Sequence, residues 1–405
     1  MRRLALLVVF LAFPVTAFAH DAHGGIDVID VSGPLDRSAL EFMADSIEDA
    51  AANGQELAVL QVNSKAVLDG EAYDNLVDLL TNQPIPVAVW IGPAPAAAYG
   101  GAALIALQNQ QSAISQGSEV GRFNPVVLGE DRQETIGPED VSTAEKSGLE
   151  LQPTLRQYLQ DLDGRIFQTV DGPVTVSTIE EFGAGVTLKT VTFRKPGLIN
   201  RFFRLAVTPE AAFFFLTVGL SMVTFELFAL GPGVAAGVAA ISLLLAGWGV
   251  VNLPVRWWAV GLAIAGWAIL TAAYQKGGVL VMTGLGALLL QIGGMFFIDG
   301  AGQIDPRWWL VLPSVLAALF FFLLAMPTVQ RARLSTQTIG RDSLIGHTGK
   351  ALVDFEPDGL VEVDGARWRA TAHREAGIEE GDEVSVTGVD GLYLEVGPPD
   401  PDRER

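Results

Sequence analysis

The strongest constraint on this chain is the stretch from residue 209 to 328, because it is almost free of charge. Its seven charged residues are Glu210, Glu226, Arg256, Lys276, Asp299, Asp305 and Arg307. Short breaks divide the stretch into five apolar segments, at about 211–230, 233–252, 257–274, 278–298 and 308–327. Each is close to the ~20 residues that a helix needs to cross a bilayer. Since backbone polar groups in lipid must be satisfied internally, we predict a bundle of four or five transmembrane helices.

The first nineteen residues indicate export. Arg2 and Arg3 precede an apolar run that ends in Ala17-Phe18-Ala19, the pattern of a secretory signal peptide cleaved after Ala19. The alternative is an uncleaved anchor helix, but the apolar run is short for a span. Either way, the domain that follows is delivered outside the cytoplasm.

The charges between the apolar segments suggest how the bundle is oriented. Five crossings would leave the carboxyl terminus inside, together with Lys276, Arg331 and Arg333, as the positive-inside rule favours. Five further cations would lie outside, against the rule: Lys195, Arg201, Arg204, Arg256 and Arg307. We expect a multi-pass protein of the cytoplasmic membrane with its amino-terminal domain outside and its carboxyl-terminal domain inside. A four-span bundle, with two segments forming a re-entrant hairpin, would instead place the carboxyl-terminal domain outside.

Residues 24–200 read as an α/β domain. Three apolar strands, in "GIDVIDVSG", "ELAVLQV" and "IPVAVWI", alternate with two helical segments. The first helix places Leu40, Met43, Ile47 and Ala50 on one stripe. Near-continuous apolar strands alternating with helices predict a parallel sheet covered on both faces.

Residues 341–397 predict a third, all-β unit. Alternating segments such as "GLVEVDGARWRATA" and "DEVSVTGVDGLYLEV" are joined by turns at "VDG" and "EEGD". About five short strands of this size are typical of a small closed barrel.

Composition excludes several functions. A formal net charge of −20 disfavours nucleic-acid binding through phosphates. The absence of cysteine excludes disulfides and thiol chemistry. His20 and His23 would form a mature terminus "HDAH", which could bind Cu(II) or Zn(II) only weakly, while His347 and His373 are expected on the barrel surface. No phosphate-binding loop or dinucleotide fingerprint occurs, so we expect no cofactor and no metal.

Taken together, the three units resemble the long form of the NfeD family. The resemblance is carried by "FELFALGPGVAAGVAAISLLL" with "NLPVRW", and by "GRDSLIGHTGKALVDFEPDGLVEVDGARWRATA". It implies a ClpP/crotonase-like domain at 24–200, transmembrane helices at 209–328 and an OB-fold-like domain at 341–397. It also implies a Ser–Lys peptidase dyad in the first domain and a stomatin- or flotillin-like membrane partner.

The peptidase motifs of that family are changed in this chain. Its small-small-Ser-small-Gly turn reads Ala97-Ala98-Tyr99-Gly100-Gly101, so tyrosine stands at the nucleophile position. Its Thr-Pro-Gly-Gly oxyanion segment reads Asn63-Ser64-Lys65-Ala66. The helix that carries the base lysine is missing from "VVLGEDRQETIGPEDV", and Lys146 matches another position. Because a serine hydroxyl needs both a base and oxyanion donors, we predict a degenerate peptidase domain with no catalytic residues and no base placed to serve Tyr99.

Other candidates remain open. Ser64 beside Lys65 could form a relocated dyad, although neighbours on a strand point to opposite faces. Ser112, Ser115 and Ser118 lie in a predicted polar turn. A membrane serine endopeptidase with a rearranged centre is therefore the alternative, and a transporter is a third.

We expect roles in a groove or a membrane turn for five further residues: Gly100, Gly101, Glu226, Gly231 and Gly233. Glu226 lies in an apolar span, where a carboxylate is a functional candidate, but a lone carboxylate makes no ion path and we favour a structural role. Gly284, Gly286, Gly293 and Gly294 predict close helix packing. A homo-oligomer is a further expectation.

Overall fold

The computed structural model describes residues 24–133, 141–182, 185–229, 233–328, 341–372 and 376–399. The predicted signal peptide, His20, His23, Gly231 and His373 lie outside these ranges. The chain divides into two compact units, Met1–Met326 and Pro327–Arg405.

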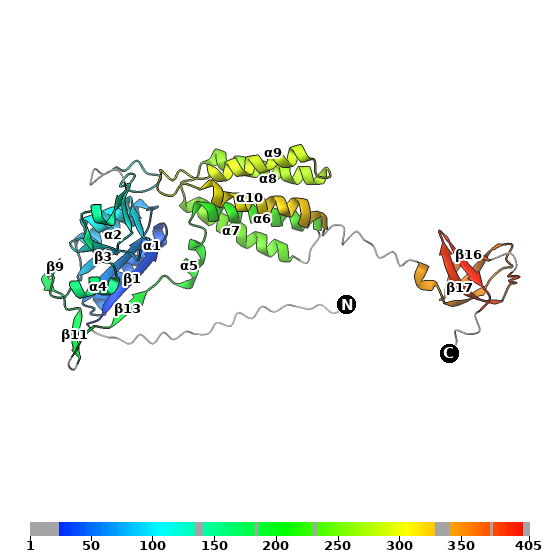
Figure 1. Cartoon of the computed structure of the whole chain (residues 1–405), viewed down its shortest axis with the longest axis horizontal. Coiled ribbons are helices and arrows are strands. Elements are labelled where there is room, and N and C mark those ends of the chain that lie inside the picture. Colours follow the sequence, from blue (N-terminus) through cyan, green and yellow to red (C-terminus); the bar gives the residue numbers. More distant parts are fainter. Residues whose placement is uncertain are drawn as a thin grey trace. The chain divides into compact units, whose positions relative to one another are not determined.

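A six-stranded sheet forms the centre of the first unit (Figure 1). All of its pairings are parallel, as the apolar strands predicted. Its strands, in spatial order, are β13 (Val191–Arg194), β1 (Ile26–Ser32), β2 (Leu57–Asn63), β3 (Val87–Ile91), β5 (Ser112–Ile114) and β8 (Glu150–Leu151).

Helices cover both faces of this sheet because its central strands are apolar on both sides. Helices α1 (Arg37–Ala52), α2 (Gly70–Thr81) and α3 (Gly101–Gln108) share one hydrophobic core with β1, β2 and β3. Helix α4 (Leu155–Asp161) packs on the other face. The predicted stripe of α1 is buried, and Asp36 begins the helix by accepting a hydrogen bond from the Ala39 amide at 3.2 Å.

A second, smaller sheet joins β4 (Ala97–Tyr99), β6 (Glu119–Gly121) and β7 (Ser142–Thr143). It meets the large sheet through a bridge between Ser64 and Ala98. Two hairpins follow, β9 (Ile166–Thr169) with β10 (Gly172–Thr175) and β11 (Ile179–Phe182) with β12 (Gly185–Leu188). This second sheet places the predicted nucleophile turn beside the carboxyl end of β2.

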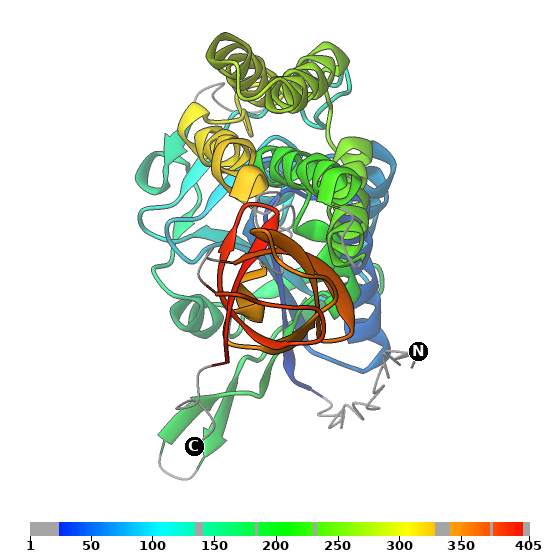
Figure 2. The same ribbon diagram turned by 90° about the vertical axis from the view of Figure 1, so that its right-hand side faces the viewer.

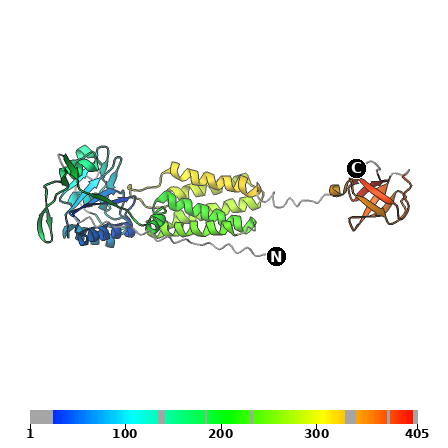
Figure 3. The same ribbon diagram turned by 90° about the horizontal axis from the view of Figure 1, so that it is seen from below.

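A short helix, α5 (Leu198–Arg204), leads into the apolar helices, which lie side by side (Figure 3). They are α6 (Pro209–Ala229), α7 (Val234–Asn252), α8 (Trp257–Gln275), α9 (Leu280–Met295) and α10 (Trp308–Phe320), the last continued by a π-helical turn, Phe321–Ala325. Among the described residues, four helices are long and apolar enough to cross a membrane, and α9 is shorter, with 16 residues. This agrees with the predicted bundle of four or five helices.

Glycine packing between the apolar helices is confirmed only in part. A Cβ on Gly286 would lie 2.9 Å from the Gly266 carbonyl oxygen, and one on Gly293 would lie 2.7 Å from the Ala263 nitrogen, so α8 and α9 touch through their backbones. Gly294 is similarly crowded by Val311 and Phe213. Gly284 has nothing within 4 Å of such a Cβ, so the packing prediction is wrong for that residue.

The apolar helices alternate in direction. The end of α7 lies against the start of α6, the start of α8 lies against the end of α9, and the start of α10 lies against the start of α6. The Arg256 amide donates to the Phe297 carbonyl at 3.0 Å, and the Arg256 side chain pairs with Asp299 at 3.0 Å. The Arg307 amide donates to the Glu210 carboxylate at 3.2 Å. These helix ends therefore share one face of the bundle.

The second unit contains the predicted barrel, which Figure 2 shows in red and orange. It is closed by β14 (Thr348–Ala351), β15 (Asp358–Val363), β16 (Ala366–Ala372), β18 (Tyr393–Gly397) and β17 (Glu383–Asp390), in that order. Alternate residues such as Val361, Val384 and Leu394 fill its core. His347 is exposed, as expected, and its Nδ1 lies 2.8 Å from Asp364.

Candidate functional site

The turn between β4 and α3 is held against the carboxyl end of β2 by the backbone. The Tyr99 amide donates to the Ser64 carbonyl at 3.0 Å, and the Ala97 amide donates to the Asn63 side-chain oxygen at 3.1 Å. Gly100 then takes a φ of +56°, which favours glycine, and α3 begins at Gly101. The two segments that the sequence singled out are thus brought together.

Tyr99 is buried, with 6% of its surface exposed. Its hydroxyl donates to the Glu119 carboxylate at 2.6 Å. Burial, followed by this hydrogen bond, raises the pKa of Tyr99 to about 12. The phenol therefore stays neutral at physiological pH. Glu119 on the neighbouring strand β6 accepts this hydrogen bond and stabilises the neutral phenol, so the expectation that no base serves Tyr99 stays a prediction.

Two cations lie over the Tyr99 ring. The Lys65 Nζ is 5.7 Å and the Arg122 Cζ is 6.0 Å from the ring centroid, within reach of a cation–π interaction. Lys65 therefore packs against an aromatic ring. Ser64 is buried, and its hydroxyl donates to the Ala66 carbonyl at 3.0 Å. This arrangement gives no support to a dyad between Ser64 and Lys65.

The glycine amides of the turn already have acceptors. The Gly100 amide donates to the Arg122 carbonyl at 3.0 Å, and the Gly101 amide donates to the Val126 carbonyl at 2.8 Å. Both glycines are also required for packing, since a Cβ would lie 2.9 Å from the Pro125 oxygen at Gly100 and 2.6 Å from the Tyr73 ring at Gly101. An oxyanion needs donors that are preorganised and unused, and these two are engaged.

The described part of the chain shows no helix that could carry a base between α3 and β7. Residues 126–133 form turns, and 134–140 lie outside the described ranges. Lys146 is exposed at the end of a short 3-10 helix, Ala144–Lys146. The structure therefore does not bring Lys146 to the turn.

Gln303, in the loop between α9 and α10, seals the turn, and sequence reasoning missed it. Its side chain is 5% exposed, and its Nε2 donates to the carbonyls of Arg122 at 3.1 Å and Pro125 at 2.9 Å. A Cβ on Gly100 would lie 3.0 Å from the same nitrogen. No local pattern identifies a contact between residues so far apart. Glu119 and Arg122 were missed for the same reason.

Two of the serines expected in a polar turn are instead buried. The hydroxyls of Ser115 and Ser118 lie 2.7 Å apart, and the Ala96 amide donates to Ser118 Oγ at 3.1 Å. These contacts tie the start of β6 to the segment before β4, because buried hydroxyls need partners. The predicted turn is present, since the Ser118 amide donates to the Ser115 carbonyl at 3.1 Å, but both side chains are buried in it.

A cavity of about 370 Å³ lies next to the Asn63–Ala66 segment. The helix bundle supplies its other wall, so the cavity lies between the α/β domain and the first turns of α6 and α10. Its polar lining includes Asn63, Lys65, Glu210, Gln303, Asp305 and Arg307. Charges of both signs in one cleft suit a peptide backbone or a zwitterionic group.

The membrane-turn residues are placed as follows. Glu226 is half-buried in the last turn of α6, and its Oε2 is buried with no hydrogen-bond partner among the described residues. Gly233 starts α7 with a φ of +87°. A structural role for Glu226 stays a prediction.

The described residues contain no group of acidic or histidine side chains that could hold a metal ion.

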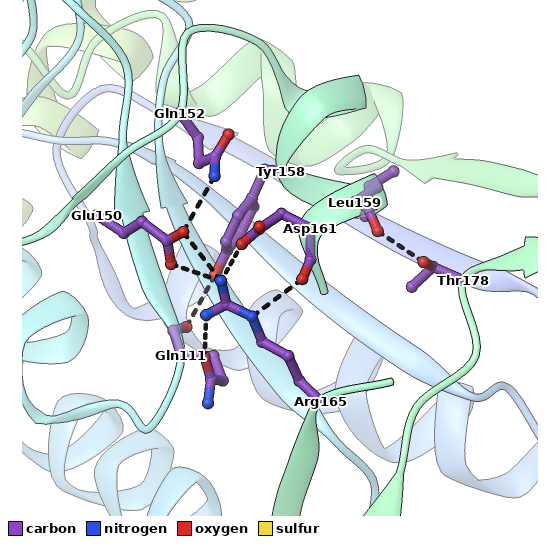
Figure 4. Close-up of polar contacts among 8 residues, drawn as sticks. All are labelled: Gln111, Glu150, Gln152, Tyr158, Leu159, Asp161, Arg165 and Thr178. Carbon is purple, nitrogen blue, oxygen red and sulfur yellow. Dashed lines mark hydrogen bonds and ion pairs between the residues drawn. The ribbon is translucent and has the colours of Figure 1, made fainter. Parts of the chain in front are cut away.

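A second polar cluster lies at the far edge of the large sheet, around Arg165 (Figure 4). Its guanidinium donates to Gln111 Oε1 at 2.7 Å, to Glu150 Oε1 at 2.9 Å and to the Asp161 carboxylate. Burial and the hydrogen bond with Glu150 raise the pKa of Asp161. Burial opposes ionisation of Glu150 too, but hydrogen bonds from Asp161, Gln152 and Arg165 outweigh it and lower the pKa of Glu150.

The Arg165 cluster fastens α4 to β5 and β8. The Tyr158 hydroxyl adds a hydrogen bond to the Gln111 carbonyl at 3.0 Å, and Thr178 Oγ1 donates to the Leu159 carbonyl at 2.6 Å. Its charged groups face one another, so the cluster has a structural role.

The described fold combines an α/β domain, a bundle of helices long and apolar enough to cross a membrane, and a small closed β-barrel. Residues 210–326 match the NfeD integral membrane domain, and residues 341–398 match the NfeD-like C-terminal, partner-binding domain. These two parts of the chain are therefore NfeD domains, as the resemblance indicated.

Comparisons with individual proteins extend to the whole chain. It is 23% identical over 447 residues to the membrane-bound protease PH1510 of Pyrococcus horikoshii, covering 97% of each. Among solved structures, it is similar to a membrane protease of P. horikoshii specific for a stomatin homologue, with 19% identity, a TM-score of 0.37 and coverage of 45% of this chain and 98% of that one. The C-terminal domain of a stomatin operon partner protein of P. horikoshii is 34% identical over 15% of this chain and 92% of that one, with a TM-score of 0.14.

Proposed function

We propose that this protein is a membrane scaffold whose protease-like domain binds a peptide or partner protein without cleaving it. The observation that carries the proposal is the state of Tyr99, a neutral phenol that donates to Glu119 at the nucleophile position. A phenol with a pKa of about 12 is almost entirely protonated at neutral pH and is a poor nucleophile.

The surrounding groups support the same proposal. Lys65 contacts the Tyr99 ring, and the Gly100 and Gly101 amides are engaged by backbone carbonyls. General-base activation and oxyanion stabilisation each contribute about 10²-fold or more in serine enzymes, so losing both removes most of the rate enhancement. The cavity beside Lys65 is then a binding cleft.

The partner we propose is a stomatin- or flotillin-like membrane protein. The match of residues 341–398 to a partner-binding domain supports a protein partner, and the specificity of a similar membrane protease for a stomatin homologue supports its kind. We place the protease-like domain outside and the barrel inside the cytoplasm, which follows from the predicted signal peptide. Self-association stays part of the proposal.

The first experiment measures peptidase activity in the full-length protein in detergent. We would compare wild type, Tyr99→Ser and Tyr99→Phe against unfolded and apolar peptides and against a fluorophosphonate probe. The proposal expects no cleavage and no labelling by wild type and Tyr99→Phe. Cleavage by the wild type would contradict it and favour the alternative, a serine endopeptidase with a rearranged centre, whose nucleophile Ser64→Ala, Ser115→Ala and Ser118→Ala would then identify.

The second experiment tests the partner. We would crosslink the full-length protein in native membranes and compare the recovered proteins with those from a chain ending at residue 328, which lacks the barrel. The proposal expects a stomatin- or flotillin-like protein only with the full chain. Recovery of no such protein, in membranes that contain one, would contradict it.

A further inference from the structure

Helix α5 exposes an apolar stripe immediately before the first transmembrane helix. Leu198, Ile199, Phe202 and Leu205 are 81%, 74%, 40% and 57% exposed. Their spacing places them on one face of the helix. Nothing in the described part of the chain covers this face. A stripe of large apolar side chains on so short a helix needs a partner.

The position of α5 identifies the layer in which that partner lies. The Phe203 ring packs on the Trp248 ring, with centroids 4.8 Å apart, and Trp248 is in the last turn of α7. The segment that follows α5 packs against α7, since a Cβ on Gly249 of α7 would lie 2.6 Å from the Ala206 carbonyl oxygen. Helix α6 then begins at Pro209. Tryptophans at the ends of spans mark the membrane interface. Helix α5 is therefore at the level of the lipid headgroups.

A cationic pocket lies beside the stripe. It has a volume of about 360 Å³, and three cations line it, Lys195, Arg201 and Arg204. Lys195 lies 3.3 Å from Asp30, and Arg204 lies 3.7 Å from Asp36 and donates to the carbonyls of Ser32 at 2.7 Å and Pro34 at 3.2 Å. The Arg201 side chain is exposed, and its guanidinium has no acceptor among the described residues. One guanidinium is thus left for an external anion.

We propose that α5 lies in the headgroup layer and that the pocket at Lys195, Arg201 and Arg204 binds the phosphate of an anionic phospholipid. The occupant follows from continuity with the membrane-spanning helix α6 and from charge. Three clustered cations stand out in a chain of net charge −20, and guanidinium groups pair well with phosphate. Lipid binding also explains why these cations occur on the side that the positive-inside rule disfavours.

The depth of α5 is tested by spin labelling, because the chain contains no cysteine and each introduced one is unique. The full-length protein carrying Leu198→Cys, reconstituted in phosphatidylcholine:phosphatidylglycerol nanodiscs, would be compared with Gln160→Cys, at an exposed position on α4. The proposal expects the label at 198 to be more accessible to oxygen than to a polar nickel complex, and the label at 160 to show the reverse. A label at 198 as open to the nickel complex as the label at 160 would overturn it.

The headgroup site is tested by native mass spectrometry of lipids retained by the full-length protein. Each cation near an anionic membrane surface strengthens binding about fivefold, so Arg201→Gln should reduce retained phosphatidylglycerol about fivefold and Arg201→Gln with Lys195→Gln about 25-fold. Arg156→Gln, an exposed arginine on α4, is the matched control and should change nothing. Equal retention of phosphatidylcholine and phosphatidylglycerol by the wild type would overturn the proposal. So would displacement of the lipid by millimolar inorganic phosphate, which would indicate a site for the free ion.

Discussion

Two polar clusters in the α/β domain show how similar side chains serve different ends. The edge cluster, around Arg165, joins an arginine to two carboxylates and an amide. The turn cluster, around Tyr99, joins a phenol to one carboxylate and places Lys65 and Arg122 over its ring. Charges in the edge cluster face one another. The turn cluster leaves Lys65 on the wall of a cavity.

The two clusters differ in which parts of the fold they connect. The edge cluster joins segments that are far apart in the sequence, since Arg165 contacts Gln111 and Glu150. The turn cluster connects neighbouring strands that the backbone already pairs. We therefore expect the edge cluster to contribute more to stability and the turn cluster to determine what the domain can bind or cleave.

Arg165→Ala should have the largest effect on stability. It removes one cation that is 29% exposed and leaves Glu150 and Asp161 close together without it. We expect the free energy of unfolding to fall by about 3 kcal/mol, because three hydrogen bonds of a charged group are lost, each worth ~1.5 kcal/mol or more, and exposure to solvent reduces the total. Chemical denaturation of the full-length protein measures it. Arg156→Ala, at an exposed position on α4, should change it by less than ~0.5 kcal/mol. Equal effects would show that the Arg165 contacts are not stabilising.

The same contrast explains what the sequence could predict. Strands β1 to β3, helix α1, the apolar helices and the barrel follow from periodicity, which is a local property of the chain. The altered turn at Tyr99 was visible as a motif. Glu119, Arg122 and Gln303 were not, because their roles depend on contacts across the fold, such as that between Gln303 and Arg122, 181 residues apart. The burial of Ser115 and Ser118 was missed because a polar stretch says nothing of the segment that covers it.

Gln303→Ala should have the next largest effect, and it is local. It removes the Gln303 amide, so the carbonyls of Arg122 and Pro125 beside Gly100 each lose a hydrogen bond. We expect a loss of about 2 kcal/mol, since each lost hydrogen bond costs ~1 kcal/mol. Hydrogen exchange should speed up at residues 122–126 and in the loop between α9 and α10.

The edge cluster provides the internal control for the Gln303 experiment. Exchange in α4 and β8 should stay unchanged in Gln303→Ala, because the Arg165 contacts are elsewhere in the domain. Faster exchange throughout the α/β domain would instead show that the turn cluster stabilises the whole domain, and the contrast between the two clusters would fail.

The smallest expected effect is on the ionisation of Tyr99. Its pKa is raised first by burial and then by the hydrogen bond to Glu119, to about 12, from an ordinary value of 10.0. Because the folded-state pKa is the higher one, the neutral phenol contributes stability that is fully present below pH ~10 and is lost as the pH rises toward ~12. Glu119→Gln removes the negative charge and should lower the pKa of Tyr99 toward its ordinary value, while burial keeps it raised.

Absorbance titration of the phenols isolates Tyr99 when the Tyr99→Phe curve is subtracted from the wild-type curve. The same subtraction in the Glu119→Gln background gives the shifted value. Tyr158, whose pKa is raised chiefly by burial in the edge cluster, should titrate unchanged by Glu119→Gln. A Tyr99 step near pH 10 in the wild type would mean that Glu119 does not hold the phenol in its neutral form.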